Sequence, residues 1–500
     1  MFHQYALSVI AISLQFFLVP MAIAQDKQHI LTLDDALRIA REQSPDALTT
    51  KQEFRRSYWS YKTFKGTYLP QVGVSAEIPN VNRVIEKITN YETGVINYVP
   101  TQNTTFTGAL KITQEIGFTG GSLSLQSGLQ RLDNFFFTDS ATTSYYSTPI
   151  NIIYNQPIFK FNPYKWDKKL EPLAYDQAQR KYLEDIEKIN MKMVYFFFTL
   201  LNAQIEKKIA DSTLSNNIEL YKIAEGRYNY GQILENELLN LKLQFLKAQT
   251  RVEDAKTSLD LALDQFKSFL RLKDTIPVVL IPPANIDFFI VDPVKAVEEA
   301  NNNSSASLDF DRRLLEAQRD VNKAKMDGRF DANLYATFGY NQTAANVNKA
   351  YKIPLDQEQV ALGMEIPILD WGVARGRIKI AESQEEIVNN SVAQERIDFE
   401  REVRLKAIKF NQQKTLVQIA AESDKVAKKT YELTKARFLI GKPIDIRDLN
   451  QAQIDMDNFE KAYYSALQTF WQSYFELRQM TLYDFEKSER LTFNVKDIKP

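Results

Sequence analysis

Two stretches of the 500-residue chain decide its fold: Tyr221–Asn240 reads YKIAEGRYNYGQILENELLN, and Tyr431–Asn450 reads YELTKARFLIGKPIDIRDLN. In each copy a charged amphipathic segment leads to a glycine, and a second one leads away from it. Each copy therefore predicts the tip of a long helical hairpin. Two unrelated helix C-caps are the alternative, because glycine commonly follows a helix. Six positions match at an offset of 210, namely Tyr221, Arg227, Tyr228, Gly231, Leu239 and Asn240 against Tyr431, Arg437, Phe438, Gly441, Leu449 and Asn450.

The tip motif belongs to a longer internal repeat. Leu31–Ala36 opens a helix, and Val291–Ala296 repeats this opening at an offset of 260. Thr32 is the expected N-cap of the first helix. Nearer the tips the offset falls to 210, as Pro157 and Pro367 show. The first half therefore contains about fifty residues, upstream of Pro157, that the second half lacks.

After each opening helical section, apolar residues alternate with polar or small residues, with a period of two. We expect strands at about 70–79 and 147–159 in the first half, and at about 329–341 and 359–369 in the second. Segments of roughly ten residues with one apolar face are typical of transmembrane barrel strands. A half-buried sheet in a water-soluble protein has the same pattern.

The inserted residues alternate in the same way. Alternation on both sides of Thr119-Gly120-Gly121 predicts an extra hairpin at about 105–132 with a tight turn. We expect long polar loops beside it, at about 80–104 and 133–146.

Each second strand leads through a proline, Pro157 or Pro367, into a helix with no obvious stop before the tip. Proline suits such a join, since it is tolerated at strand edges and in the first helical turn. From about Lys160 to Gly231 the first of these helices would measure about 105 Å at 1.5 Å per residue. Charged residues accompany spaced Leu, Ile, Phe and Val along both helices, which favours coiled-coil packing.

The composition excludes several classes of function. The 62 Lys and Arg residues against 63 Asp and Glu give a net charge of -1, so no overall basic field indicates a nucleic-acid partner. There is no cysteine, and the two histidines are His3 and His29. Disulfides, thiol catalysis and nearly all zinc sites need residues that the chain lacks. We predict no enzyme activity, no cofactor and no metal site.

The first residues have the pattern of a signal peptide. Residues 5–24 are largely apolar and end in Ala22-Ile23-Ala24-Gln25, an A-x-A cleavage pattern. We expect a signal peptide at 1–24, a first structural repeat at 25–273 and a linker at 274–292. A second repeat at 293–485 and a loosely ordered polar tail at 486–500 follow. No Lys or Arg precedes the apolar segment, so an uncleaved anchor helix is the alternative.

These features together resemble the TolC-like outer-membrane efflux proteins, the outer-membrane factors of tripartite efflux or type I secretion systems. The resemblance extends from about Leu31 to about Tyr483 and is most specific at Arg227–Gly231, at Arg437–Gly441 and around the two prolines. It implies a mainly α fold with a transmembrane β-barrel portion, built from an internal twofold repeat. Three protomers would share one outer-membrane barrel of about 12 strands. Their long coiled-coil helices would form a hollow α-barrel in the periplasm.

The resemblance also implies a function. The homotrimer would be a passive exit duct in the outer membrane, in contact with lipid and extending into the periplasm. A periplasmic adaptor (membrane fusion) protein and an inner-membrane pump would deliver its substrates. The hairpin tips would contact the adaptor and form the aperture, which makes these residues the candidate docking positions: Arg227, Tyr228, Gly231, Leu239, Asn240, Arg437, Phe438, Gly441, Leu449 and Asn450.

Three departures from the family leave questions open. The extra hairpin could widen the barrel wall, lie over its mouth or fold into the lumen. No cysteine follows the signal, so the lipid anchor of many relatives is absent. Asp445 and Asp448 are not placed as in the family's aperture ring, and we assign them no gating role. A periplasmic coiled-coil scaffold without a pore is the alternative function, and the sequence does not say whether a drug, a metal ion or a protein is transported.

Overall fold

The computed structural model of the chain describes residues 29–89, 92–135, 141–273, 277–283, 288–440, 446–494 and 498. It divides into two compact units. The first contains the described residues up to Ala40 and from Phe196 to position 283. The second contains those from Arg41 to Tyr195 and from Phe288 onward. The predicted signal peptide and Gly441 lie outside the described residues.

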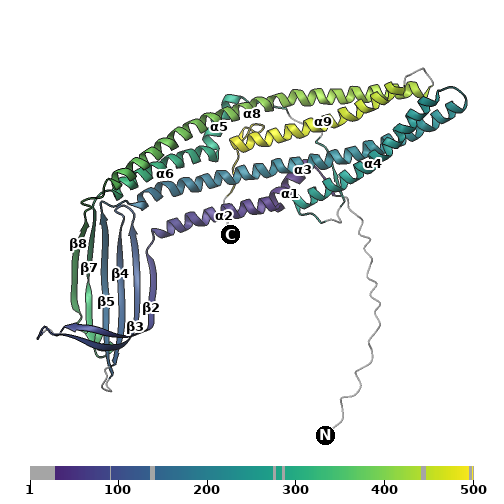
Figure 1. The fold of residues 1–500 in the computed structure, drawn as a ribbon. Helices are drawn as coiled ribbons and strands as arrows, with labels where there is room; N and C mark the ends of the chain where they lie inside the picture. The colour runs from purple at the N-terminus through teal and green to yellow at the C-terminus, as the bar shows by residue number, and fades with distance from the viewer. Residues whose placement is uncertain are drawn as a thin grey trace, which may run out of the picture. The chain divides into compact units, whose positions relative to one another are not determined.

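A six-stranded antiparallel sheet lies in the second unit, and Figure 1 shows its strands side by side. The spatial order is β2-β3-β4-β5-β7-β8, so β2 and β8 are the two edges. The short helix α7 (Val347–Ala350) interrupts the connection from β7 to β8. The six strands are β2 (Gln71–Thr89), β3 (Ile96–Ile116), β4 (Gly121–Phe135), β5 (Ala141–Ile158), β7 (Asp331–Ala344) and β8 (Leu355–Glu365).

The sheet extends further than the sequence predicted. Residues 80–89 and 96–104, expected as a long polar loop, lengthen β2 and β3 into a two-stranded extension. Most of 133–146 likewise belongs to β4 and β5. The loop prediction was wrong for these residues, because the Val, Ile, Thr and Tyr among the polar residues favour strands.

Long helices follow the strands of both repeats. In the second unit α9 and the shorter helices α5 and α6 pack along α8. Equivalent serines cap α2 and α6: Ser44 Oγ accepts a hydrogen bond from the Ala47 N–H at 3.1 Å, and Ser304 Oγ accepts one from the Ser307 N–H at 3.3 Å. The helices are α2 (Pro45–Thr67), α5 (Pro293–Asn303), α6 (Ser305–Asp327), α8 (Val373–Leu439) and α9 (Ile446–Thr481).

The first unit is built on a helical hairpin. Helix α3 (Pro163–Asn229) runs through both units, and its residues after Tyr195 pack on α4 (Glu235–Leu270). The rings of Phe196 and Phe269 lie 4.8 Å apart there. A parallel pair of β1 (His29–Leu31) and β6 (Val278–Leu280) completes the unit, with β6 inside the predicted linker.

Helix α1 (Leu33–Gln43) follows β1. The predicted cap is confirmed, because Thr32 Oγ1 accepts a hydrogen bond from the Asp35 N–H at 3.2 Å.

The element bounds reproduce the two sequence offsets. Helices α1 and α5 have 11 residues each, α2 and α6 have 23 each, and α3 and α8 have 67 each. Helix α5 starts 260 positions after α1 (Pro293 and Leu33), and α8 starts 210 positions after α3 (Val373 and Pro163). The strands β3 and β4 account for the difference. At 1.5 Å per residue each of the two longest helices measures about 100 Å.

The C-terminal residues contact the helices of the second unit. Strand β9 (Tyr483–Asp484) pairs with β10 (Glu489–Arg490), and the ring of Phe493 lies 5.2 Å from that of Phe54 on α2. Arg55 Nε donates a hydrogen bond to the Ile498 carbonyl at 2.9 Å. The prediction of a loose tail is therefore wrong for these residues. Isolated apolar residues in a polar segment give no periodic signal of such packing.

An arginine side chain that is 14% exposed lies between two buried carboxylates in the second unit. The Arg478 guanidinium donates to Glu187 Oε1 at 3.1 Å, to Asp484 Oδ2 at 3.0 Å and to the Tyr474 hydroxyl at 3.1 Å. Burial is the largest influence on Glu187 and raises the pKa of its carboxyl, although the neighbouring Arg478 acts in the opposite direction. This ion pair ties α3 to α9 and to the strand that follows it.

Candidate functional site

The first hairpin tip ends α3 in a Schellman motif. The Gly231 N–H bonds to the Tyr228 carbonyl and the Gln232 N–H bonds to the Arg227 carbonyl, both at 2.9 Å. Gly231 has a φ of 71°, in the left-handed region that favours glycine. A β-carbon at Gly231 would have open space around it. The backbone conformation at this position therefore favours glycine. Among the described residues, no neighbouring side chain covers the outer surface of the turn there.

Helix α4 begins three residues beyond this turn. The Leu234 N–H donates to Glu237 Oε2 at 3.1 Å, which satisfies one of the free donors at the helix start. The first tip is therefore a closed turn between two capped helices, with Tyr230 and Leu234 exposed on it.

Equivalent residues of the two tips differ in exposure. Tyr228 is 39% exposed and Phe438 5%, whereas Leu239 is 56% exposed and Leu449 is completely buried. Arg437 is exposed on the last turn of α8, and Asn240 and Asn450 are half-buried. The repeated motif therefore produces one tip that presents its aromatic and leucine side chains and one that packs them inside.

An apolar seam follows the exposed side of α8 toward the second tip. Ile419, Val426, Leu433 and Ile440 recur every seven residues and are all exposed. This is the spacing of a coiled-coil seam. In a single copy this seam is left open to solvent.

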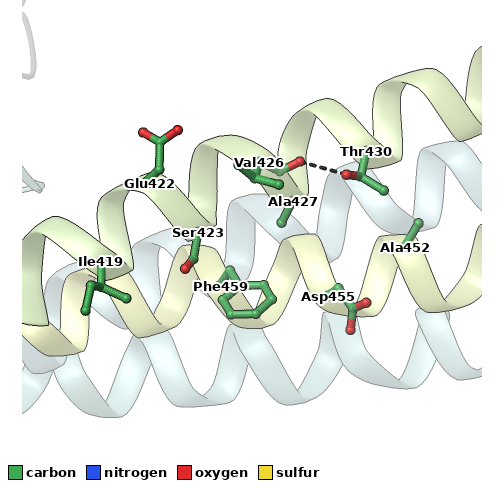
Figure 2. A pocket seen from close by; sticks show the side chains of 9 residues that line it. All are labelled: Ile419, Glu422, Ser423, Val426, Ala427, Thr430, Ala452, Asp455 and Phe459. Atoms are coloured by element: carbon green, nitrogen blue, oxygen red, sulfur yellow. Dashed lines mark hydrogen bonds between the residues drawn. The ribbon is translucent and has the colours of Figure 1, made fainter.

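A groove of about 480 Å³ lies between α8 and α9 beside this seam. Figure 2 shows Ser423 and Ala427 of α8 pointing toward α9, from which Phe459 and Asp455 complete the lining. Thr430 Oγ1 is bonded to the Val426 carbonyl of its own helix at 2.9 Å, so it offers the groove little beyond its methyl group. The groove is mainly apolar and suits packing of another helix.

The two faces of the sheet differ in polarity. One row of neighbouring positions, which crosses from β2 to β7, is apolar: Val72, Ile112, Leu125, Ile152 and Phe338. The adjacent row on the opposite face is small or polar: Gly73, Lys111, Gln126, Asn151 and Gly339. The large apolar side chains Val72, Leu125, Ile152 and Phe338 are exposed to solvent in the single copy. A sheet with one apolar and one polar face is typical of the wall of a membrane channel, in which the apolar face contacts lipid and the polar face contacts water.

Aromatic residues border the apolar face where the strands meet the helices. Phe118 is 94% exposed and Trp371 is 87% exposed, and Phe159 lies with its ring 4.9 Å from that of Phe330. Aromatic girdles at this level mark the membrane interface in outer-membrane proteins.

The two prolines occupy different positions at these joins. Pro157 is the penultimate residue of β5 and pairs with Asn333 of β7. On the other side of β5 the pairing with β4 stops at Asn155, so Pro157 lies at the end of a strand, a position where proline is tolerated. Pro367 lies two residues beyond the end of β8. In both repeats the helix begins six residues after the proline, at Pro163 and Val373.

The described part of the chain contains no cluster of three or more His, Cys, Asp or Glu side chains that could hold a metal ion. Among the same residues, no helix is both long and apolar enough to cross a membrane.

Two comparisons with known proteins found similar chains. Residues 299–481 match the family model described as outer membrane efflux protein. The CmeC outer membrane channel of Campylobacter jejuni is similar in structure, with a TM-score of 0.65 at 15% identity over 93% of this chain and 89% of that one. The outer membrane protein VceC of Vibrio cholerae gives 0.62 at 12% identity, over 92% of this chain and 97% of that one. No curated protein matches the sequence. At these identities the structural likeness establishes the fold.

Proposed function

We propose that this chain belongs to the outer membrane efflux protein family and is the outer-membrane exit duct of a tripartite efflux or secretion system. The observation that carries the proposal is the sheet, whose apolar face is exposed and whose edge strands β2 and β8 each have one strand neighbour among the described residues. Exposed edge strands and exposed apolar faces favour association with other chains or with lipid. Lipid covers the apolar face, and neighbouring copies in a homotrimer pair the edges.

The helices support the same assembly. The seam of Ile419, Val426, Leu433 and Ile440 packs against a helix of another copy, which buries side chains that one copy exposes. The polar face of the sheet lines the water-filled path, and transport through it is passive. Energy comes from the inner-membrane pump, so the duct itself needs no catalytic group.

The hairpin tips are the proposed contact with a periplasmic adaptor protein. The first tip presents Tyr228, Tyr230 and Leu239, and Arg437 is exposed at the second. Aromatic and arginine side chains are the residues that most often anchor protein interfaces. The proposed docking set is Arg227, Tyr228, Gly231, Leu239, Asn240, Arg437, Phe438, Gly441, Leu449 and Asn450.

The assembly and its conductance test this function. Protein extracted from membranes in mild detergent is expected to crosslink as a trimer and to conduct ions in planar bilayers. Washing membranes with carbonate should leave it in the membrane fraction, because lipid covers the apolar face of the sheet. A monomer that carbonate releases and that does not conduct would instead support the periplasmic scaffold.

Gly231→Val is expected to abolish efflux in cells while the trimer and its conductance remain. A β-branched residue at a φ of 71° distorts the turn, and this is the surface that the adaptor meets. Gly226→Val is the matched control: Gly226 lies five residues before Gly231, inside α3, with open space around its β-carbon and without a positive φ. Efflux should therefore survive in Gly226→Val. Loss of the trimer in Gly231→Val alone would show that the tips hold the assembly together and do not serve as a docking surface.

A further inference from the structure

We propose that the inserted hairpin is a part of the channel wall, so that three copies close a sheet of about eighteen strands (three times six) instead of about twelve. This inference rests on the proposed function and adds the dimensions of the duct. The outer-membrane section is then a wide vestibule, and size selection lies in the helical section and at the tips.

The hairpin is integrated into the sheet on both sides. The strand β3 pairs with β2 from Gln71↔Thr113 to Thr89↔Ile96, and β4 pairs with β5 from Ser122↔Asn155 to Phe135↔Ala141. The hairpin therefore separates β2 from β5. A hairpin folded over the mouth or into the lumen would leave these two strands paired with each other.

The polarity of the hairpin matches that of its neighbours. Ile112 and Leu125 continue the apolar row between Val72 and Ile152, and Lys111 and Gln126 continue the polar row on the other face. A strand inside a water-filled lumen has no reason to keep neighbouring leucine side chains, such as Leu110, Leu123 and Leu125, exposed on one face. Its exposed leucines therefore place the hairpin in the lipid-facing wall.

The turn of the hairpin is tied to the start of α3. Asn162 Nδ2 donates to the carbonyls of Gly117 and Phe118, at 3.1 and 3.3 Å. Gln156 Nε2 adds a hydrogen bond to the Thr119 carbonyl at 3.0 Å. A β-carbon at Gly120 would lie 3.1 Å from Asn162 Cγ, so glycine permits the close approach. These contacts hold the turn at the level of the strand-to-helix join and prevent the hairpin from swinging out of the wall.

The insertion changes the sheet and leaves the helices unchanged. Corresponding helices of the two repeats have equal lengths, so the extra residues add only to the wall. Barrel diameter grows roughly in proportion to strand number at a given tilt. Eighteen strands give a diameter about 1.5 times that of twelve, and therefore a cross-section about 2.25 times as large.

Engineered cysteines test the position of the hairpin, because the chain has no cysteine of its own. In the purified trimer, the double variants Ser75→Cys/Ala109→Cys and Ser124→Cys/Ile153→Cys are expected to crosslink with a short thiol reagent. Thr113→Cys/Ser124→Cys lies within the hairpin and is the control, which crosslinks wherever the hairpin lies. Crosslinking of the control without the other two pairs would overturn the proposal.

Electron microscopy of the same trimers measures the wall directly. The strand-built end of the full-length trimer is expected to be about 1.5 times as wide as that of a variant lacking Ile96–Phe135, in which residues 90–95 and 136–140 join β2 to β5. A twelve-strand diameter for the full-length trimer overturns the inference and leaves the exit-duct function standing. Absence of any ring-shaped trimer overturns the proposed function itself. If the deletion variant does not assemble, the diameter of the full-length trimer alone still distinguishes a wall of about eighteen strands from one of about twelve.

Discussion

Replacing Arg478 by methionine is expected to lower the free energy of unfolding of the helical region by about 3–5 kcal/mol, the usual cost of removing one partner of a buried ion pair. The Arg478 side chain is 14% exposed, and its guanidinium bonds to Glu187, Asp484 and Tyr474. Methionine fills a similar volume but removes the cation that bonds to both carboxylates, so that of the two arginines that act on Glu187 only Arg41 remains. The loss is therefore dominated by uncompensated burial of negative charge.

The pH dependence of this loss has a defined sign. Burial raises the pKa of Glu187 even with Arg478 beside it, and Arg478→Met removes a neighbour that lowers that pKa. A carboxyl whose pKa is higher in the folded than in the unfolded state stabilises the fold when protonated, and this stabilisation is lost as the pH rises through the folded pKa. The variant should therefore lose less stability near pH 5 than near pH 8.

Trp471 provides the measurement, since its ring lies 5.7 Å from that of Tyr474 beside the ion pair. Its fluorescence can be followed during denaturant unfolding in a background with Trp59, Trp166 and Trp371 replaced by phenylalanine. Lys425→Met, which breaks an exposed pair with Glu422, is the control and should leave the unfolding midpoint unchanged. Equal midpoints for the two variants would show that the ion pair does not stabilise the fold.

The sequence predicted the repeat because its signals are local. One signal is a glycine that follows a charged amphipathic helix. The other is a change in the spacing of apolar residues, from a period of 3.6 to a period of 2. Each signal can be recognised within about twenty residues. The same offsets of 210 and 260 recur in the observed starts of α3 and α8 and of α1 and α5. Comparison of the two copies of the tip motif identified the proposed docking positions Arg227 and Arg437.

The remaining features depend on packing between distant segments. Nothing in the motif distinguishes exposed Tyr228 from buried Phe438, because helix packing decides their exposure. The Arg478 ion pair joins residues 291 positions apart, a separation that no spacing rule detects. Asn162, which fixes the inserted hairpin, resembles any polar residue before a helix until its contacts with Gly117 and Phe118 are known. The path of the hairpin could therefore be stated only as three alternatives from sequence.

Leu125→Arg is expected to destabilise the channel wall by about 2–4 kcal/mol per copy, the cost of arginine near the bilayer midplane on the lipid face of a barrel. Leu125 lies on β4 in the apolar row, next to Ile152 of β5. If the hairpin belongs to the wall, both side chains face lipid at the same depth. Leu125→Arg and Ile152→Arg should therefore reduce the amount of folded trimer in the outer membrane to a similar extent.

Ser122→Arg is the matched control for this prediction. Ser122 lies three residues before Leu125 on the same strand but on the polar face, opposite Glu115 of β3. Arginine there faces water and an acidic neighbour, so trimer yield should be unchanged. The measurement is the fraction of heat-modifiable trimer in outer-membrane fractions on gels, together with the urea midpoint of the purified trimers.

A hairpin in the lumen or over the mouth predicts a different order, in which Leu125→Arg is tolerated as well as Ser122→Arg and only Ile152→Arg is damaging. Because the two hypotheses differ at Leu125 alone, that one substitution separates a channel wall of six strands per copy from a wall of four.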